Sequence, residues 1–275
     1  MLTLPTLLGQ TALPSAPINF AMTNDSKKYS TKDFWNSRAA SFPRFESGDD
    51  TYEARMLRLA RENGVDFCGK TVLDVGCGSG MYTLRLARMA DHVTAVDVSD
   101  EMLRLLREDA AAMSITNITT VCSGWDDFSA HERFDVVFAS MTPAIESDAS
   151  REKLMQYAAD KVVFMGFSDR MLSNVMQGLH EHYGIAPKIF NNAQDMRTWL
   201  DHNGVPYTAI PVTGQWVVAK SREDLVDVCL TTLREYGAEP DQRFVEAHVE
   251  AFKDEQGQYV ERTDYVIEMI IWQKR

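Results

Sequence analysis

The sequence has few cysteines and no long apolar run. Its 275 residues include four cysteines, Cys68, Cys77, Cys122 and Cys229, and none of them forms a C-x-x-C pair. That scatter excludes a zinc ribbon and a disulfide framework and is typical of reduced thiols in the cytoplasm. No uninterrupted apolar stretch approaches the roughly 20 residues that a membrane-spanning helix needs. We therefore predict a cytoplasmic protein with no membrane span and no metal site.

Basic residues are also in deficit. Lys and Arg number 28 against 40 Asp and Glu, which gives a net charge of −12. Proteins that hold nucleic acid or an anionic bilayer usually carry a basic surplus. We therefore predict a small-molecule partner and no nucleic acid. Hydrophobic residues at 45% and charged residues at 25% are ordinary for a globular chain, which at this length forms one large domain or a domain with a cap.

The first 20 residues carry three prolines, Pro5, Pro14 and Pro17, and no basic residue. A signal peptide starts with a basic region, so we interpret this stretch as a loose tail. Met22 is an alternative to Met1 as the natural start.

The middle of the chain alternates between two patterns. Stretches typical of buried strands alternate with helical stretches. The predicted strands are residues 71–75, 92–97, 118–122, 134–140 and 161–167. Strands that alternate with helices in this way favour a parallel sheet covered on both faces. Beyond residue 167 we expect a hairpin that turns at Thr213-Gly214 and two final strands at 259–261 and 265–272.

These patterns predict a fold and a domain organisation. We expect an α/β fold with a doubly wound, Rossmann-like, mostly parallel sheet and an antiparallel C-terminal edge strand. Residues 1–50 would form a tail and a helical lid, and residues 51–167 the core. Residues 168–237 would be an inserted cap, and residues 238–275 would complete the sheet.

One motif is misleading. Residues 64–71, GVDFCGKT, match the pattern of a P-loop. A P-loop follows a strand and opens a helix, so that backbone N–H groups meet the phosphates. Here a helix precedes the motif and a strand follows it, so we interpret Lys70 as a solvated residue at the strand entrance.

The most informative stretch is residues 72–80, VLDVGCGSG, where a buried strand leads into three alternating glycines. Glycines there let the backbone approach a ligand closely. Asp74, at the end of the strand, would repel a pyrophosphate but attract an ammonium or a sulfonium. Met81 stands where G-x-G-x-x-G needs its last glycine. Both features disfavour a nicotinamide dinucleotide.

A second carboxylate follows one strand later. Asp97 lies 17 residues after Gly80 and ends the next predicted strand. An acidic residue at that place can accept hydrogen bonds from both hydroxyls of a ribose. The alternative is that Asp97 only places a charge before the following helix.

Together these motifs resemble a known family. Residues 72–80 and 96–103 are similar to the first two motifs of class I S-adenosylmethionine-dependent methyltransferases, and residues 125–128 and 134–140 resemble the third and fourth. The resemblance covers roughly residues 51–167. Within the family, the sequence resembles the small-molecule branch that includes quinone-biosynthesis methyltransferases.

The resemblance implies an S-adenosyl-L-methionine site. Asp74, Gly76 and Gly78 would line the methionine end of the cofactor, and Gly80 would complete the turn. Asp97 would bind the ribose hydroxyls. The remaining implied contacts are with the adenine (Val98, Met102, Trp125, Asp126), the sulfonium (Ser140, Met141) and an N-terminal lid (Tyr29, Trp35).

The resemblance also implies the reaction, which is transfer of the methyl group by in-line displacement to an O, N or C nucleophile of a small molecule. Relatives that methylate amide or base nitrogens have two prolines and an aromatic residue after the fourth strand. This chain has only Pro143 there, which disfavours such substrates.

The catalytic residues stay unknown at this level. His180, His182 and Tyr207 are candidates for a base, and the two histidines, two positions apart on a predicted helix, point to different faces and cannot share a metal. Two alternative functions stay open, a non-catalytic cofactor-binding sensor or scaffold and a nicotinamide-dependent oxidoreductase. Aromatic residues in 168–237 could form a substrate chamber or the interface of a homodimer.

Overall fold

The computed structural model describes residues 31–169, 171–187 and 189–274. Tyr29 and the two candidate start residues lie outside these ranges, so the predictions for them stay predictions. Within the described residues, no helix is long and apolar enough to cross a membrane.

The predicted sheet is present. β1 (Thr71–Val75), β2 (His92–Asp97), β3 (Ile118–Cys122), β4 (Phe134–Ser140) and β5 (Ala158–Phe167) are parallel and lie in the order β3-β2-β1-β4-β5. β8 (Tyr259–Gln273) pairs with β5 in the antiparallel sense. The strand order reverses beside β1, so the carboxyl ends of β1 and β4 flank a crevice of the kind in which open α/β sheets bind ligands. The predicted α/β class is confirmed.

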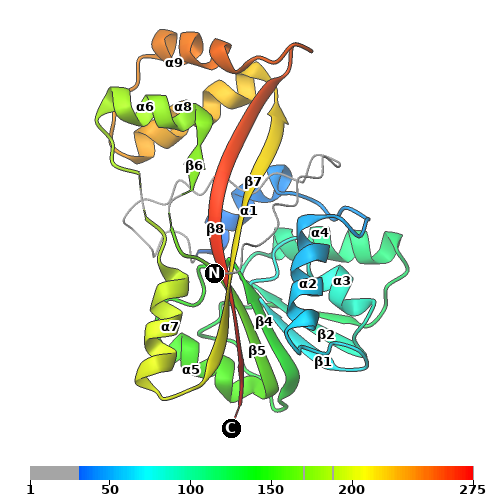
Figure 1. Cartoon of the computed structure of the whole chain (residues 1–275). Helices are drawn as coiled ribbons and strands as arrows, with labels where there is room; N and C mark the ends of the chain where they lie inside the picture. The colour runs from blue at the N-terminus through cyan, green and yellow to red at the C-terminus, as the bar shows by residue number, and fades with distance from the viewer. Residues whose placement is uncertain (1–30, 170, 188, 275) are drawn as a thin grey trace.

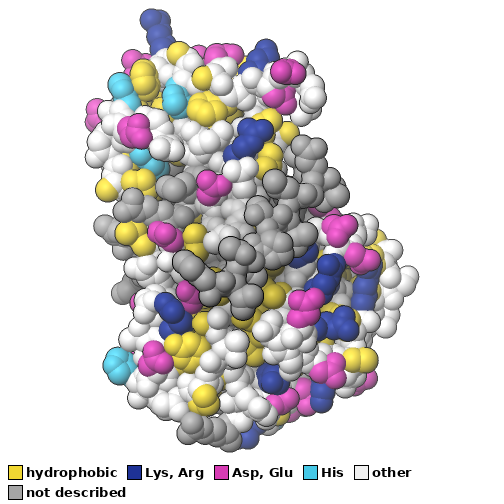
Figure 2. All heavy atoms as spheres, viewed as in Figure 1, with side chains coloured by type: hydrophobic (Ala, Val, Ile, Leu, Met, Phe, Trp, Pro, Cys, Tyr) yellow, Lys and Arg dark blue, Asp and Glu magenta, His cyan; other side chains and the backbone are white. Residues whose placement is uncertain are grey.

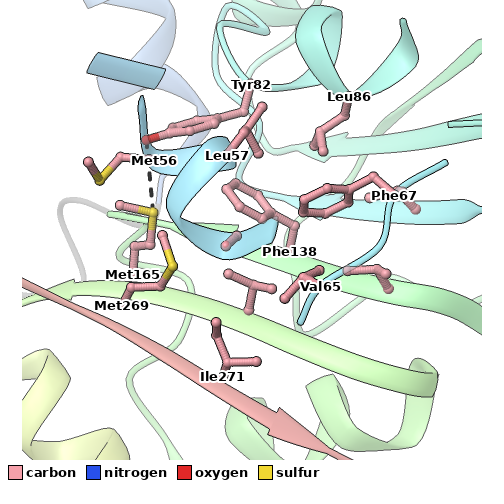
Figure 3. Packing of buried hydrophobic residues seen from close by; sticks show 14 of the residues in the cluster. Met56, Leu57, Val65, Phe67, Tyr82, Leu86, Phe138, Met165, Met269 and Ile271 are labelled. Atoms are coloured by element: carbon pink, nitrogen blue, oxygen red, sulfur yellow. Dashed lines mark hydrogen bonds between the residues drawn. The ribbon is translucent and has the colours of Figure 1, made fainter. Parts of the chain in front are cut away.

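Helices cover both faces of the sheet (Figure 1). α2 (Tyr52–Glu62), α3 (Thr83–Ala87) and α4 (Asp100–Ala112) lie on one face, and α5 (Asp148–Tyr157) and α7 (Asn192–His202) on the other. Side chains of a strand alternate between the faces, so Val136 and Phe138 of β4 join the core under α2 and α3, whereas Val137 and Ala139 join the core under α5 and α7. Figure 3 shows the first of these cores around Phe138.

The helices begin where the sequence supplies caps. The Thr51 hydroxyl accepts a hydrogen bond from the Ala54 N–H at the start of α2 (3.3 Å). The Ser99 hydroxyl does the same for the Met102 N–H at the start of α4 (3.1 Å). Such caps satisfy N–H groups that have no partner within the helix. They fix two helix starts that border the crevice.

The predicted hairpin at Thr213-Gly214 is wrong. β7 (Tyr207–Lys220) is one continuous strand, and it pairs along its whole length with β8, which is also one strand rather than two. Gly214 lies opposite Tyr265, and a Cβ on Gly214 would be 2.3 Å from the Tyr265 hydroxyl. This glycine therefore serves a close side-chain approach within a strand and not a turn.

The long β7–β8 pair carries a cap at its far end (Figure 1). α6 (Asn174–Tyr183), α8 (Arg222–Glu235) and α9 (Gln242–Val249) share one apolar core that includes Leu179, Leu225 and Val245. β6 (Leu172–Ser173) pairs with β8 below this cap. The grouping differs from the predicted segment 168–237, because α7 packs on the sheet and α9 belongs with the cap. Sequence order could not predict this grouping, since two strands lead to the cap and back.

The N-terminal segment packs beside α4. α1 (Lys32–Arg38) and the 3-10 helix η2 (Ala39–Ser41) place Trp35 against Met102 and Leu105. Asn36 accepts a hydrogen bond from the Ser99 hydroxyl (2.6 Å) and donates one to Asp100 (2.8 Å). A second 3-10 helix, η3 (Glu250–Phe252), follows α9.

The P-loop match has the wrong surroundings. α2 precedes residues 64–71 and β1 follows them. Lys70 lies directly before β1, and its carbonyl accepts a hydrogen bond from the Asp91 N–H (2.9 Å). The loop does not lead from a strand into a helix, so the motif lacks the phosphate-binding geometry.

Candidate active site

A cavity of about 530 Å³ lies at the carboxyl ends of the parallel strands. This volume is typical of small-molecule sites. The lining residues come from α1 and the segment after it, from the loops after β1, β2, β3 and β4, from the end of β5, from β7, from α4 and from the starts of α2 and α3. The predicted cofactor-binding residues that line the cavity are Trp35, Asp74, Gly76, Gly78, Asp97, Val98, Met102, Trp125, Asp126, Ser140 and Met141.

The glycine turn after β1 needs its glycines. Gly76 and Gly78 have φ of +69° and +55°, a region that side chains disfavour. A Cβ on Gly76 would lie 2.2 Å from the Thr142 hydroxyl oxygen. The turn therefore packs directly against the loop after β4 and brings bare backbone to the cavity wall.

The Asp97 side chain, at the end of β2, forms a hydrogen bond with this turn. Its carboxylate accepts hydrogen bonds from the Gly78 N–H (2.8 Å) and the Ser99 N–H (2.9 Å). Burial raises the pKa of Asp97, and backbone N–H groups, including these two, oppose that rise. Each carboxylate oxygen can accept a further hydrogen bond, so Asp97 can still bind two hydroxyl groups from the cavity.

Asp74 is a buried carboxyl group on the cavity wall. It is 3% exposed, and it accepts a hydrogen bond from the Thr83 hydroxyl (2.6 Å). Burial raises the pKa of Asp74 to about 7; the Thr83 bond opposes the rise, and the nearby charge of Asp97 adds to it. A positively charged ligand would favour the ionised form of this group.

The end of β4 is strained beside the cavity. Met141 has φ of +48°, a left-handed conformation that is uncommon for a residue with a side chain. Its N–H donates to the Met165 carbonyl on β5 (2.8 Å), which holds the chain in this conformation. Strained backbone of this kind concentrates at functional sites.

Comparison with known proteins identifies the core. Residues 72–166 match the family model described as a methyltransferase domain. The chain contains a methyltransferase domain. A methyltransferase domain, as the motifs predict, is thus confirmed for residues 72–166.

The relatives of this methyltransferase domain match it over short segments. The malonyl-[acyl-carrier protein] O-methyltransferase of Bacillus cereus is 24% identical over 110 residues, which are 39% of this chain and 40% of that protein. The ubiquinone biosynthesis O-methyltransferase of Neisseria meningitidis is 37% identical over 90 residues, 31% of this chain and 38% of that protein. The chain thus spans well under half the length of these relatives.

The fold is that of solved proteins. The YcgJ protein of Bacillus subtilis superposes with a TM-score of 0.51 at 14% identity, and the match covers 80% of this chain and 98% of that one. At this identity the likeness supports the fold alone.

Two predicted site residues of the methyltransferase domain are placed differently from the others. Gly80 does not line the cavity; its φ is +88°, and a Cβ there would lie 2.2 Å from Leu106 of α4. Gly80 therefore serves the packing of the turn on α4. Trp125 reaches the cavity wall, but its ring stacks on Phe128, and its indole N–H donates to the Ser150 carbonyl (3.0 Å).

The three candidate bases do not line the cavity. His180 belongs to α6 of the cap, where its ring contacts Tyr236 and burial lowers its pKa. His182 stacks on Phe244, also in the cap. The Tyr207 hydroxyl donates to Asp201 (3.4 Å), away from the cavity. The structure gives none of the three a place beside a bound substrate.

The sequence analysis missed one group of lining residues. Tyr52 and Glu53 come from the start of α2, Tyr82 precedes α3, and Phe167 and Trp216 come from β5 and β7. Their side chains are all buried, with exposed fractions of 8% or less. Trp216 is one of the aromatic residues in 168–237 for which the sequence leaves a substrate chamber or a dimer interface open, but the others carry no motif. Only the approach of α2 and β7 to the strand ends reveals them.

The charge of the cavity wall has one sign. Among the described residues, no Lys, Arg or His lines the cavity. The acidic residues that do so are Glu53, Asp74, Asp97, Asp126, Asp127 and Glu146. Such a wall suits a cation and repels a phosphate or a polyanion.

Proposed function

We propose that the protein binds S-adenosylmethionine in this cavity and transfers the methyl group to a small molecule. The observation that carries the proposal is the pairing of Asp97 with the glycine turn inside a segment that matches methyltransferase domains. The acidic wall fits a ligand that carries a sulfonium and an ammonium. Activity of the whole chain is part of this proposal, since the matched segment covers residues 72–166 only.

The chain's own groups would mainly position the reactants. Bound S-adenosylmethionine supplies an electrophilic methyl group on its sulfonium. Asp97 would bind the ribose hydroxyls, while Asp126 would bind the adenine at the far end. Asp74 would face the positive groups of the methionine end. The aromatic walls exclude water, and holding two reactants in line can contribute about 7–11 kcal/mol to lowering the barrier.

The acceptor is proposed to be a small molecule and not a nucleic acid. The acidic cavity and the net charge of −12 support this, and on the face drawn in Figure 2, basic and acidic side chains are interspersed. The cytoplasmic location and the homodimer stay predictions. A sensor or scaffold would use the same cavity without turnover, whereas a nicotinamide dinucleotide is disfavoured by Asp74 at the glycine turn.

Calorimetry tests whether the protein binds S-adenosylmethionine. We expect S-adenosylmethionine and its demethylated product, S-adenosylhomocysteine, to bind with one molecule per chain, because the cavity has one glycine turn and one Asp97. NADH titrated under the same conditions is the control and should give no binding heat. Folded protein that binds NADH but neither methionine derivative would contradict the proposal.

The affinity for S-adenosylmethionine should rise with pH through 7. Asp74, with a pKa of about 7, must lose its proton to face a cation, so binding releases protons below that pH. We expect affinity at pH 6 to be about tenfold weaker than at pH 8. Titrations in two buffers of different ionisation enthalpy measure the proton release. Asp74→Asn should remove the pH dependence; a variant that keeps it would assign the effect to another group.

A further inference from the structure

The cavity extends beyond the part that the cofactor motifs line. Those motifs follow β1, β2, β3 and β4. The lining residues outside them include four aromatic side chains, which come from the start of α2, the turn before α3, the end of β5 and β7: Tyr52, Tyr82, Phe167 and Trp216. The part of the cavity that these four side chains line, which we call the aromatic chamber, is where a methyl acceptor has room.

The rings of the aromatic chamber form a connected wall. The centroids of Tyr52 and Trp216 are 6.1 Å apart, and those of Phe167 and Trp216 are 6.3 Å apart. Tyr265 supports the wall from behind, at 4.2 Å from Trp216 and 5.8 Å from Tyr52. Tyr82 is fixed by a weak hydrogen bond from its hydroxyl to the Met165 sulfur (3.9 Å, Figure 3). Aromatic faces arranged in this way attract organic cations.

Glu53 places a buried carboxylate among these rings. It lines the cavity, is 8% exposed, and forms no salt bridge with a described residue. Burial raises the pKa of Glu53. Burial also raises the pKa values of Tyr52 and Tyr82, and the negative charge of Glu53 raises both further. Glu53, Tyr52 and Tyr82 all line the same cavity.

Two arginines act on Glu53 without forming a salt bridge with it. The charges of Arg85 and Arg55 oppose the rise in the pKa of Glu53. The terminal nitrogens of Arg85 donate to the carbonyls of Gly48 and Glu46 and to the Thr51 hydroxyl (3.0, 2.5 and 2.7 Å), while its Nε has no hydrogen-bond partner among the described residues. These bonds hold the segment that leads into α2. A buried carboxylate without an ion-pair partner is costly, and a cationic ligand would remove that cost.

We propose that the methyl acceptor is an amine, bound as its cation in the aromatic chamber with Glu53 as counter-ion and proton acceptor. The inference rests on the proposed methyltransferase function and names the class of its substrate. Anionic acceptors are disfavoured, because no described Lys, Arg or His lines the cavity. A neutral alcohol or phenol would leave Glu53 without a partner.

The step balances with Glu53 as the base. An ammonium ion has no lone pair, so R–NH3+ first gives one proton to the Glu53 carboxylate and becomes R–NH2. The nitrogen lone pair then forms the N–CH3 bond while the S–CH3 bond breaks, and that electron pair stays on sulfur as an uncharged thioether. The positive charge passes to the methylated nitrogen. Glu53 loses its proton to water after the product leaves.

The test compares 2-phenylethylamine with 2-phenylethanol, which has the same ring and chain without the charge. Both are titrated into protein saturated with S-adenosylhomocysteine. We expect the amine to bind at least about tenfold more tightly than the alcohol. Glu53→Gln should abolish this preference and leave S-adenosylhomocysteine binding unchanged. Glu62→Gln, an exposed site on the same helix, is the matched control and should keep the preference.

A second readout is methyl transfer itself. With S-adenosylmethionine present, mass spectrometry should detect N-methylated 2-phenylethylamine, formed more slowly by Glu53→Gln and at an unchanged rate by Glu62→Gln. Equal affinity for amine and alcohol in the unsubstituted protein would overturn the amine inference but not the proposed methyltransferase function. A preference for the amine that survives Glu53→Gln would do the same. Failure to bind S-adenosylhomocysteine would instead contradict the proposed function, and that measurement comes first.

Discussion

Asp97→Ala should weaken S-adenosylmethionine binding by about 2–4 kcal/mol, which is roughly 30- to 700-fold in affinity. Two effects combine. The ribose hydroxyls lose a charged acceptor, and the Gly78 N–H loses its 2.8 Å hydrogen bond, so the glycine turn becomes less well ordered. Isothermal titration calorimetry measures the loss.

Asp97→Asn separates the two contributions. The amide oxygen can still accept hydrogen bonds, but the NH2 group that replaces the second oxygen cannot, and the charge is gone. We expect an intermediate loss for this variant. Thermal unfolding monitored by circular dichroism checks that both variants are folded. An affinity that Asp97→Ala leaves unchanged would remove this residue from the binding site.

Gly76→Ala should be more damaging to the protein as a whole. The added Cβ would lie 2.2 Å from the Thr142 hydroxyl oxygen and 2.6 Å from the Thr142 Cβ, in a backbone with φ of +69°. Left-handed backbone costs about 1–2 kcal/mol for a residue with a side chain, and overpacking adds about 1–3 kcal/mol. We expect the free energy of unfolding to fall by about 2–5 kcal/mol and cofactor binding to be lost, because the loops after β1 and β4 must separate.

The matched control is Gly69→Ala. Gly69 has nearly the same backbone, with φ of +63°, but nothing lies within 4 Å of its would-be Cβ. The free energy of unfolding of Gly69→Ala should fall only by the cost of the left-handed backbone, about 1–2 kcal/mol. This variant should keep its affinity for the cofactor. Urea denaturation and calorimetry on both variants measure these quantities. Equal losses at Gly69 and Gly76 would show that the contact with Thr142 is unimportant.

The parallel core and the glycine turn were predictable from sequence patterns alone. Val72, Leu73 and Val75 place apolar side chains on both faces of β1, as a strand buried on both faces requires, and the alternation with helices predicted the parallel sheet. Gly76 and Gly78 were recognisable because only glycine readily adopts positive φ. Asp97 was predictable because successive parallel strands end at the same edge of a sheet. These features are local or follow from strand order.

The cavity wall that includes Glu53 and Trp216 is visible only in the folded structure. Glu53 and Trp216 lie 163 positions apart in the sequence, and no local pattern marks either as a neighbour of the other. Gly214 resembled a turn residue, yet it lies inside β7 because the Tyr265 ring occupies the space beside it. A close approach between two distant segments depends on how their side chains pack with those of the neighbouring segments. The sequence pattern of one segment therefore does not predict it. The wall around Glu53 and Trp216 therefore had to be found from contacts, whereas the wall formed by the glycine turn and Asp97 could be predicted from motifs.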